Sequence, residues 1–225
     1  MNESHFVDRN VRAPFVIGLT GAIASGKSTV ARMLREHGAH IIDADEVYRD
    51  LLRPQSALWQ NVVARFGPVI VAPDGQIDRG ALGGIVFQDP AALADLDALT
   101  HPAVVAEIRR RIADSRSDVV VVEAVKLART DLLADVDALW LATADPEVRL
   151  SRVRERAGLD DADARTRIAA SLNPLPDGMR ADVVIDTSRD LAATERQVAS
   201  AWQGLPRWLR SGKPVEWVST GQEDH

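Results

Sequence analysis

The sequence predicts an α/β protein built on a five-stranded parallel sheet flanked by helices. Five short apolar runs are spread along the chain, and most are continuous rather than alternating, which is typical of strands buried on both faces of a parallel sheet. Helical patterns separate these runs, so the connections are right-handed crossovers. The predicted strands are Phe15–Thr20, His40–Asp43, Val119–Glu123, Ala138–Ala142 and Ala181–Asp186.

Four helices are predicted around these strands. In the first, Val30, Ala31 and Leu34 share one face. The second and third begin at a proline, which is favoured in the first helical turn, and Asp145 precedes one of them as an expected N-cap. The predicted helices are Lys27–His37, Pro102–Ala113, Pro146–Arg156 and Arg189–Trp202.

One domain is expected over residues 14–204, with its core in 14–43 and 118–204. Residues 44–117 have a mostly helical pattern with a single turn signal, Pro73-Asp74-Gly75. We expect this segment to be an insertion that binds a second ligand.

A second helical insertion, rich in Arg and Asp, is expected over about residues 149–179 as a lid. Residues 1–13 and 205–225 fit no core element and are expected to be terminal extensions. Whether Trp208 and Trp217 pack on the body stays open at this point.

The composition excludes several classes of protein. Of 225 residues, 46% are hydrophobic and 27% are charged, as in a globular domain. No apolar run reaches the roughly 18 residues of a membrane span, and the N-terminus lacks the apolar centre of a signal peptide. The absence of cysteine excludes disulfides and fits a cytoplasmic protein. The net charge of −6 argues against a nucleic-acid partner.

A glycine-rich loop gives the strongest functional signal. It matches G-x-x-x-x-G-K-[ST], follows an apolar strand and opens an amphipathic helix, which predicts a P-loop NTPase fold that binds ATP. Backbone N–H groups and the helix N-terminus bind phosphate oxygens. Lys27 is placed for the β- and γ-phosphates and the Ser28 hydroxyl for Mg²⁺. The expected ATP-binding residues here are Gly21, Ala22, Ile23, Ala24, Ser25, Gly26, Lys27, Ser28 and Thr29.

Two carboxylates, Asp43 and Asp45, follow the second strand at the sheet edge where ligands bind. A carboxylate there can accept a proton from an attacking hydroxyl or hold Mg²⁺. Asp is also a common helix N-cap, and the two roles are compatible if each residue takes one.

Six arginines lie within nineteen residues of the expected lid. Three of them are spaced i, i+3, i+7 on one helix face. The planar guanidinium suits phosphate, and a closing lid would bring these charges to the transferred group. The alternative is a solvated face paired with nearby carboxylates. The six are Arg149, Arg152, Arg154, Arg156, Arg165 and Arg167.

From Val16 to about Gly204 the chain resembles the dephospho-coenzyme A kinase family. The loop alone indicates only the P-loop superfamily, whereas the Asp-Ala-Asp and His-Pro segments at these separations make the match more specific. The matching segments are Gly18–Ser28, Ile42–Arg49, Asp78-Arg79, Ile85–Phe87, Thr100–Pro102, Arg152 with Arg156, Arg167-Ile168 and Ala181–Asp186.

The resemblance implies ATP-dependent phosphorylation of the ribose 3′-hydroxyl of dephospho-coenzyme A (dephospho-CoA), by a P-loop core with a helical substrate-binding insertion and a lid. His101, before a proline, could equally be a cap or a buried hydrogen-bonded residue. The implied roles are catalysis for Asp45, Lys27 and Arg152, ATP binding for Arg156, substrate binding for Asp43, Arg49 and His101, and Mg²⁺ binding for Ser28 and Asp45. Lys126 is a further candidate for substrate binding, from its own position after the third strand and not from the resemblance.

The chain departs from the family pattern after the third strand, where Pro-Leu-Leu-Phe-Glu is usual. Here Lys126 replaces a leucine and Arg129 the final glutamate, and Thr187 replaces an asparagine after the last strand. Lys126 could contact phosphates or extend to water as a surface residue. The alternatives to this activity are another P-loop kinase, acting on a nucleoside or nucleoside monophosphate, and a catalytically impaired nucleotide-binding regulatory protein. We expect a monomer or a weak homo-oligomer.

Overall fold

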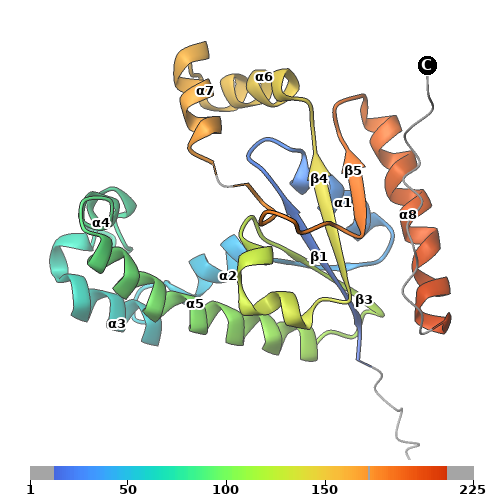
Figure 1. Cartoon of the computed structure of the whole chain (residues 1–225). Helices are drawn as coiled ribbons and strands as arrows, with labels where there is room; N and C mark the ends of the chain where they lie inside the picture. The colour runs from blue at the N-terminus through green and yellow to red at the C-terminus, as the bar shows by residue number, and fades with distance from the viewer. Residues whose placement is uncertain (1–12, 172, 212–225) are drawn as a thin grey trace, which may run out of the picture.

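The computed structural model describes residues 13–171 and 173–211, with only the backbone for 206–211. It confirms the predicted α/β fold with one five-stranded parallel sheet, in the order β2-β3-β1-β4-β5 (Figure 1). Each predicted strand lies within two residues of an observed one. The strands are β1 (Phe15–Gly21), β2 (His40–Asp43), β3 (Val119–Glu123), β4 (Ala138–Thr143) and β5 (Val183–Asp186).

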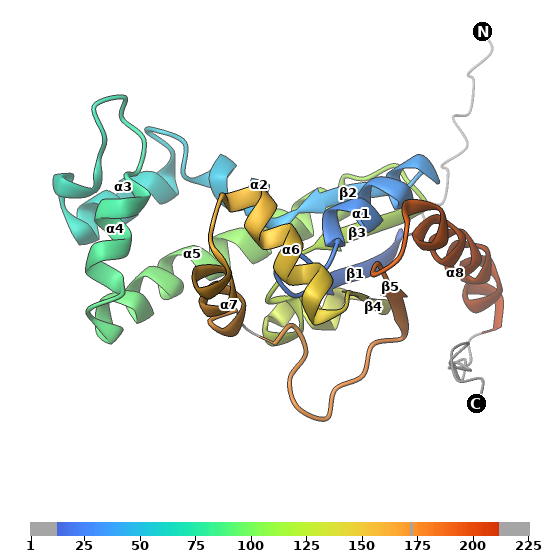
Figure 2. The ribbon, with the colours of Figure 1, turned by 90° about the horizontal axis from the view of Figure 1, so that it is seen from above.

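Helices cover both faces of this sheet, and two further groups of helices, α3 with α4 and α6 with α7, extend beyond it (Figures 1 and 2). Figures 1 and 2 show α3, α4 and the first half of α5 on one side of the molecule, with α8 on the opposite side and α6 and α7 near the ends of the strands. The helices are α1 (Lys27–Glu36), α2 (Ala44–Leu51), α3 (Ala57–Phe66), α4 (Arg79–Val86), α5 (Pro90–Ala113), α6 (Pro146–Ala157), α7 (Asp161–Ala169) and α8 (Leu191–Ser211), with short 3₁₀ turns η1 (Pro68–Ile70), η2 (Leu127–Arg129) and η3 (Asp131–Asp135).

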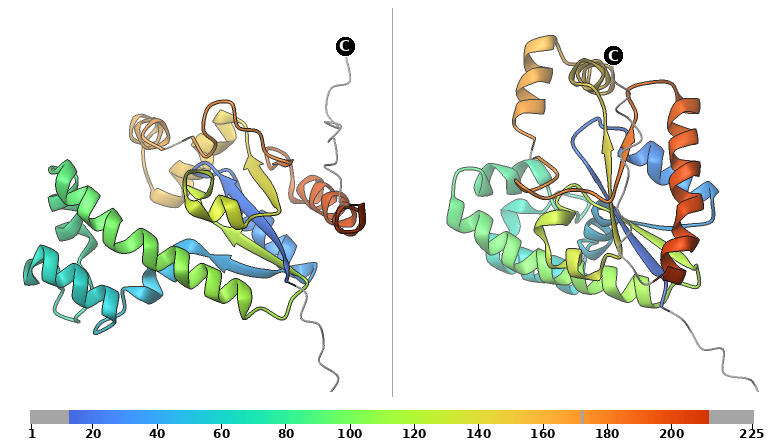
Figure 3. Two further views of the ribbon diagram at one scale, coloured as in Figure 1. Left: turned by 60° about the horizontal axis from the view of Figure 1, so that its bottom comes forward. Right: turned by 45° about the vertical axis from the view of Figure 1, so that its right-hand side comes forward.

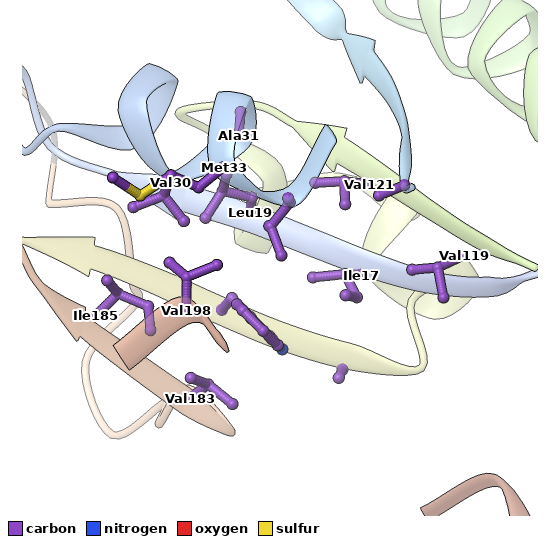
Figure 4. Packing of buried hydrophobic residues seen from close by; sticks show 14 of the residues in the cluster. Ile17, Leu19, Val30, Ala31, Met33, Val119, Val121, Val183, Ile185 and Val198 are labelled. Carbon is purple, nitrogen blue, oxygen red and sulfur yellow. The ribbon is translucent and has the colours of Figure 1, made fainter. Parts of the chain in front are cut away.

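Alternating residues of the central strands build two separate cores. Ile17 and Leu19 pack with α1 and α8 on one face of the sheet (Figure 4). Val16 packs on the other face with residues of α2, α5 and η2. All seven residues of β1 are buried, which explains its continuous apolar run.

Helix α5 is longer than the sequence predicted. Pro102 was expected to begin a helix, but it lies inside a helix that starts at Pro90. The reason is that α5 joins two cores: Leu96 packs in the core of the helical insertion, and Ile108 packs against the sheet. Burial at both ends offsets the cost of an interior proline, about 3 kcal/mol. Figure 3 shows this helix running from the insertion to the sheet.

The helical insertion is confirmed in its secondary structure. Helices α2 to α5 fill it, and the predicted Pro73-Asp74-Gly75 turn joins Val71 and Ile77, which form an isolated antiparallel bridge. Asp145 occupies the predicted N-cap position of α6, but its side chain makes no capping hydrogen bond. Its backbone N–H instead donates to Ser188 Oγ.

The last helix corrects the expected boundary at residue 205. Helix α8 runs to Ser211 rather than ending at Trp202. Leu205, only 2% exposed, packs in the core beside α1, so its burial favours continuation of the helix. The side chains of Trp208 and Trp217, and the predicted extension of residues 1–12, lie outside the described part of the chain.

An ion network joins α2 to α5, the first and last helices of the insertion. Arg111 donates to Asp50 Oδ2 of α2 at 2.9 Å and to Glu107 Oε1 at 2.9 Å. Arg110 donates twice to Glu107, at 2.8 Å each. Hydrogen bonds from Arg110 and Arg111 lower the pKa of Glu107 to about 2.

We predict that Glu107→Gln removes an acid-dependent part of the stability. Because the folded-state pKa lies below the unfolded value of about 4.5, this carboxylate stabilises the protein above that value and loses its contribution as pH falls toward 2. Urea denaturation should therefore give a larger difference in unfolding free energy between wild type and variant at pH 7 than at pH 3.5. The matched control is Glu195→Gln, an exposed carboxylate on α8. Equal differences at the two pH values would contradict the prediction.

Candidate active site

The glycine-rich loop between β1 and α1 has two residues in the left-handed backbone region. Gly26, which precedes α1, has φ +79°, and Ala24 has φ +59°. The Ser25 N–H donates to the Ala22 carbonyl at 3.1 Å, and the Val30 N–H donates to the Gly26 carbonyl as the helix begins. A left-handed alanine costs roughly 1–2 kcal/mol, so neighbouring contacts must hold this loop in place.

Thr187, just after β5, supplies one of these contacts. It is 3% exposed, and its hydroxyl donates to the Ser25 carbonyl at 2.9 Å. A Cβ on Gly26 would lie 2.6 Å from Thr187 Oγ1, so a side chain there would collide with it. Positive φ and this close approach both require glycine at position 26.

Two arginines of the predicted lid hold the same loop. Arg149 donates to the Ile23 carbonyl at 3.0 Å, and Arg152 donates to the Ala24 carbonyl at 3.2 Å. Arg152 also donates to Thr187 Oγ1 at 2.9 Å and to its carbonyl at 2.6 Å. The guanidinium expected at the transferred phosphate is here bonded to the phosphate loop and to the end of β5.

Lys27 forms an ion pair with Glu123, the last residue of β3. Lys27 Nζ lies 2.6 Å from Glu123 Oε1, and the two side chains are 15% and 11% exposed. The pair sits at the edge of the sheet where β1 and β3 end. This ion pair holds the lysine ammonium beside the loop. Because the pair is partly buried, removal of either partner would leave an uncompensated charge.

Asp43 and Asp45 take different positions. Asp43 is the N-cap of α2, and its Oδ1 accepts hydrogen bonds from the N–H groups of Asp45 at 2.8 Å and Glu46 at 3.3 Å. Asp45 is the second residue of α2 and lines a cavity of about 700 Å³. The cap therefore holds the backbone of the second carboxylate.

This cavity lies between α2, the middle of α5 and the segment that follows β3. It brings together three of the predicted residues, Asp45, His101 and Lys126, and the lining includes none of residues 21–29. His101 lies in the middle of α5, and its side chain is half exposed. Its Nε2 lies 3.5 Å from Asp97 Oδ1. His101 is therefore neither a helix cap nor a buried residue.

Two predicted residues lie apart from this cavity. Arg49 lines a neighbouring cavity of about 310 Å³, which shares Tyr48 and Leu96 with the larger one. Burial raises the pKa of the Tyr48 phenol between them, a shift that Arg79 opposes. Arg156 is exposed in the last turn of α6, and none of the described residues forms an ion pair with it.

Ser28 and Thr29 begin α1 beside Lys27, and Ser28 is exposed. Within residues 13–171 and 173–211, no group of three or more His, Cys, Asp or Glu side chains is arranged to hold a metal ion. Of the described helices, none has the length and apolar character that a membrane crossing needs.

Two residues of this site, Glu123 and Thr187, were not among those predicted, and Arg149 was expected only as one of the lid arginines. Glu123 is a carboxylate at the end of β3, the strand that pairs with β1, and a carboxylate at that edge of a parallel sheet is a signal for a ligand site. The position of Thr187 at the end of the last strand gave a weaker signal. Arg149 was assigned to the lid, but its contact with a loop carbonyl depends on where α6 packs.

Comparisons with known proteins identify the family of this chain. Residues 15–193 match the family model described as dephospho-CoA kinase. A dephospho-CoA kinase of Moorella thermoacetica is 44% identical over 87% of this chain and 94% of its own length. One of Symbiobacterium thermophilum is 43% identical over 84% of this chain and 80% of its own.

Two solved structures resemble the fold. TT1252 from Thermus thermophilus has a TM-score of 0.73 at 29% identity and covers 86% of this chain and 99% of its own. The dephospho-CoA kinase from Campylobacter jejuni has a TM-score of 0.61 at 23% identity, covering 85% of this chain and 97% of its own. With the family model matching most of its length, the chain belongs to the dephospho-CoA kinase family.

Proposed function

We propose that this protein transfers the γ-phosphoryl group of ATP to the ribose 3′-hydroxyl of dephospho-CoA, the last step of coenzyme A synthesis. The observation that carries the proposal is the pairing of two sites. A phosphate loop with a fixed lysine adjoins a separate 700 Å³ cavity that contains a carboxylate, Asp45. Family membership supports the same reaction.

In this proposal Asp45 accepts the proton of the 3′-hydroxyl as its oxygen attacks the γ-phosphorus and the bond to ADP breaks. Asp43 fixes the start of α2 and thereby the position of Asp45. Lys27 and the N–H groups of the loop neutralise charge on the transferred group. Arg152 supports the loop through its hydrogen bond to the Ala24 carbonyl, and a direct contact between Arg152 and phosphate stays a prediction.

The chain offers oxygen ligands that suit Mg²⁺. Ser28 stands in the first turn of α1, and Asp45 and Glu123 supply carboxylates at the same sheet edge. Mg²⁺ is usually held by one or two protein oxygens together with substrate phosphates, so a dedicated cluster of acidic residues is not required. When bound, the ion would offset the charge of the phosphates. Ser28 and Asp45 are its proposed protein ligands.

The direct test is an ADP-release assay on a panel of acceptors: dephospho-CoA, adenosine, other nucleosides, nucleoside monophosphates and pantetheine derivatives. The proposal expects the highest kcat/KM for dephospho-CoA. A higher value for a nucleoside or nucleoside monophosphate would assign another kinase activity. ATP binding without turnover of any acceptor would indicate a regulatory nucleotide-binding protein.

We predict that Lys27→Met lowers kcat by at least about a hundredfold, because it removes the charge placed for the β- and γ-phosphates. It should also lower stability, since Glu123 is left unpaired and mostly buried. The matched double variant Lys27→Met/Glu123→Gln should recover stability in urea denaturation but not turnover. Turnover within a few-fold of wild type would exclude this role for Lys27.

Asp45→Asn should lower kcat about 10²–10⁴-fold with little change in ATP affinity, because the amide keeps the size of the side chain but cannot take a proton. The control is Asp43→Asn, which retains an N-cap and should lose much less activity. Steady-state kinetics with both substrates varied would check this. If the loss appeared only as a raised KM for Mg-ATP, Asp45 would keep its proposed role as a Mg²⁺ ligand and its role as the base would be refuted.

Thr187→Val should lower kcat/KM for ATP about tenfold while the melting temperature stays close to wild type. The methyl group keeps the shape, but the Ser25 carbonyl loses its donor and Arg152 loses one acceptor. Thr187→Ser should restore the rate, because it returns the hydroxyl. An unchanged kcat/KM in Thr187→Val would show that the hydroxyl has no part in holding the loop.

A further inference from the structure

Two cations on the wall of the 700 Å³ cavity have no carboxylate partner among the described residues: Lys126 and Arg129. The other basic side chains of the wall are paired. Arg109 Nε lies 2.8 Å from Asp135 Oδ2, and His101 faces Asp97. Arg129 donates only to the Asn173 carbonyl, at 3.5 Å. Both Lys126 and Arg129 are exposed, so their charges are available to an anion in the cavity.

The turn that carries these cations is firmly held. The Ala124 N–H donates to the Leu19 carbonyl at 3.1 Å, and Thr20 Oγ1 donates to the Val125 carbonyl at 3.0 Å. Both contacts join the turn to β1.

Leu127, between the two cations, is fully buried and packs directly against Gly18 of the same strand. The Arg129 N–H donates to the Lys126 carbonyl at 2.8 Å. Lys126 and Arg129 therefore leave a fixed backbone on the same turn, and little ordering of the chain is needed when they bind an anion.

The position of the cavity indicates which anion this is. Asp45 and Lys126 line it together, but no residue of the phosphate loop does. The triphosphate of ATP belongs on the loop, so an anion in the cavity must arrive with the acceptor. Of the three carboxylates that line the wall, Asp97 faces His101, while Asp45 and Asp131 would repel an anion placed near them. Asp131 lies on the same segment as Lys126 and Arg129, and the two cations outnumber it there, so an anion is favoured at that segment rather than beside Asp45.

We propose that Lys126 and Arg129 bind the 5′-diphosphate of the acceptor and thereby set its 3′-hydroxyl toward Asp45. This rests on the proposed function, since it assumes an acceptor that carries a diphosphate ester on its ribose 5′ position. Lys126 neutralises one charge as a compact ammonium, and Arg129 donates a fork of parallel hydrogen bonds.

The test measures binding and turnover for Lys126→Met, Arg129→Met and the double variant. The control is Arg196→Met, an exposed arginine on α8. Calorimetry should give a dephospho-CoA Kd raised about tenfold by each substitution, and further in the double variant, with the ATP Kd within twofold of wild type. The inhibition constant of adenosine, which lacks the diphosphate, should not change. Arg129→Lys should recover part of the affinity, since it restores the charge.

Salt gives a second readout. The dephospho-CoA Kd of the wild type should rise with ionic strength, and that rise should be weaker in the double variant. A dephospho-CoA Kd within twofold of wild type in the double variant would overturn the proposal. So would an equal loss of ATP affinity, which would assign the cations to the nucleotide. Wild-type turnover of dephospho-CoA is measured first: its failure would refute the proposed function, whereas active wild type with unaffected variants refutes only this inference.

Discussion

The ion pair between Lys27 and Glu123 is the interaction on which the rest of the site depends. It requires β3 to lie directly beside β1, although 95 residues separate the two partners in the chain. In the observed order β2 lies outside β3, and β4 lies on the other side of β1. The chain reverses its direction of winding at β1, and the crevice at such a reversal is where α/β proteins bind ligands.

The phosphate loop is held from the lid side as well as from the sheet. Ile23 and Ala24 pack against a small apolar cluster formed by Leu150, Val153 and Ala164 of α6 and α7. Arg149 and Arg152 bond to the carbonyls of the same two loop residues. Helix α6 is therefore part of the support for the left-handed backbone at Ala24. A change in the position of this helix would therefore alter the loop directly.

The strands and the loop could be predicted because their signals are local. A strand buried on both faces is a short continuous apolar run, and the loop is a motif of eight residues between a strand and a helix. Helix α5 was misjudged because proline has a strong local preference for helix starts, whereas burial of Leu96 and Ile108 in two different cores decides its length. Leu205 extended α8 for a similar reason, through a tertiary contact that its neighbours in sequence do not indicate.

The residues of the site divide in the same way, into those with a local sequence signal and those that only tertiary contacts bring together. Asp43 was expected to cap a helix or to act in chemistry, and its cap is visible, but only the fold brings Asp45, His101 and Lys126 to one cavity. Thr187 lies 162 positions from Ser25, so no spacing rule could have joined them. The basic residues of the expected lid were recognised, yet their hydrogen bonds to loop carbonyls depend on how α6 packs.

Helix α5 also contributes to the shape of the 700 Å³ cavity. His101 and Pro102 line that cavity at the point where the helix passes from the core of the insertion to the core beneath the sheet. Pro102 has no N–H to donate, so the helix lacks one backbone hydrogen bond at this place. Two residues before it, the Thr100 hydroxyl donates to the Leu96 carbonyl at 2.8 Å. The wall opposite, after β3, is anchored to β1 through Leu19 and Thr20. One wall thus follows β3 and the other belongs to α5, which packs in both cores, so the direction in which α5 leaves the sheet sets the distance between His101 and the cations of the turn.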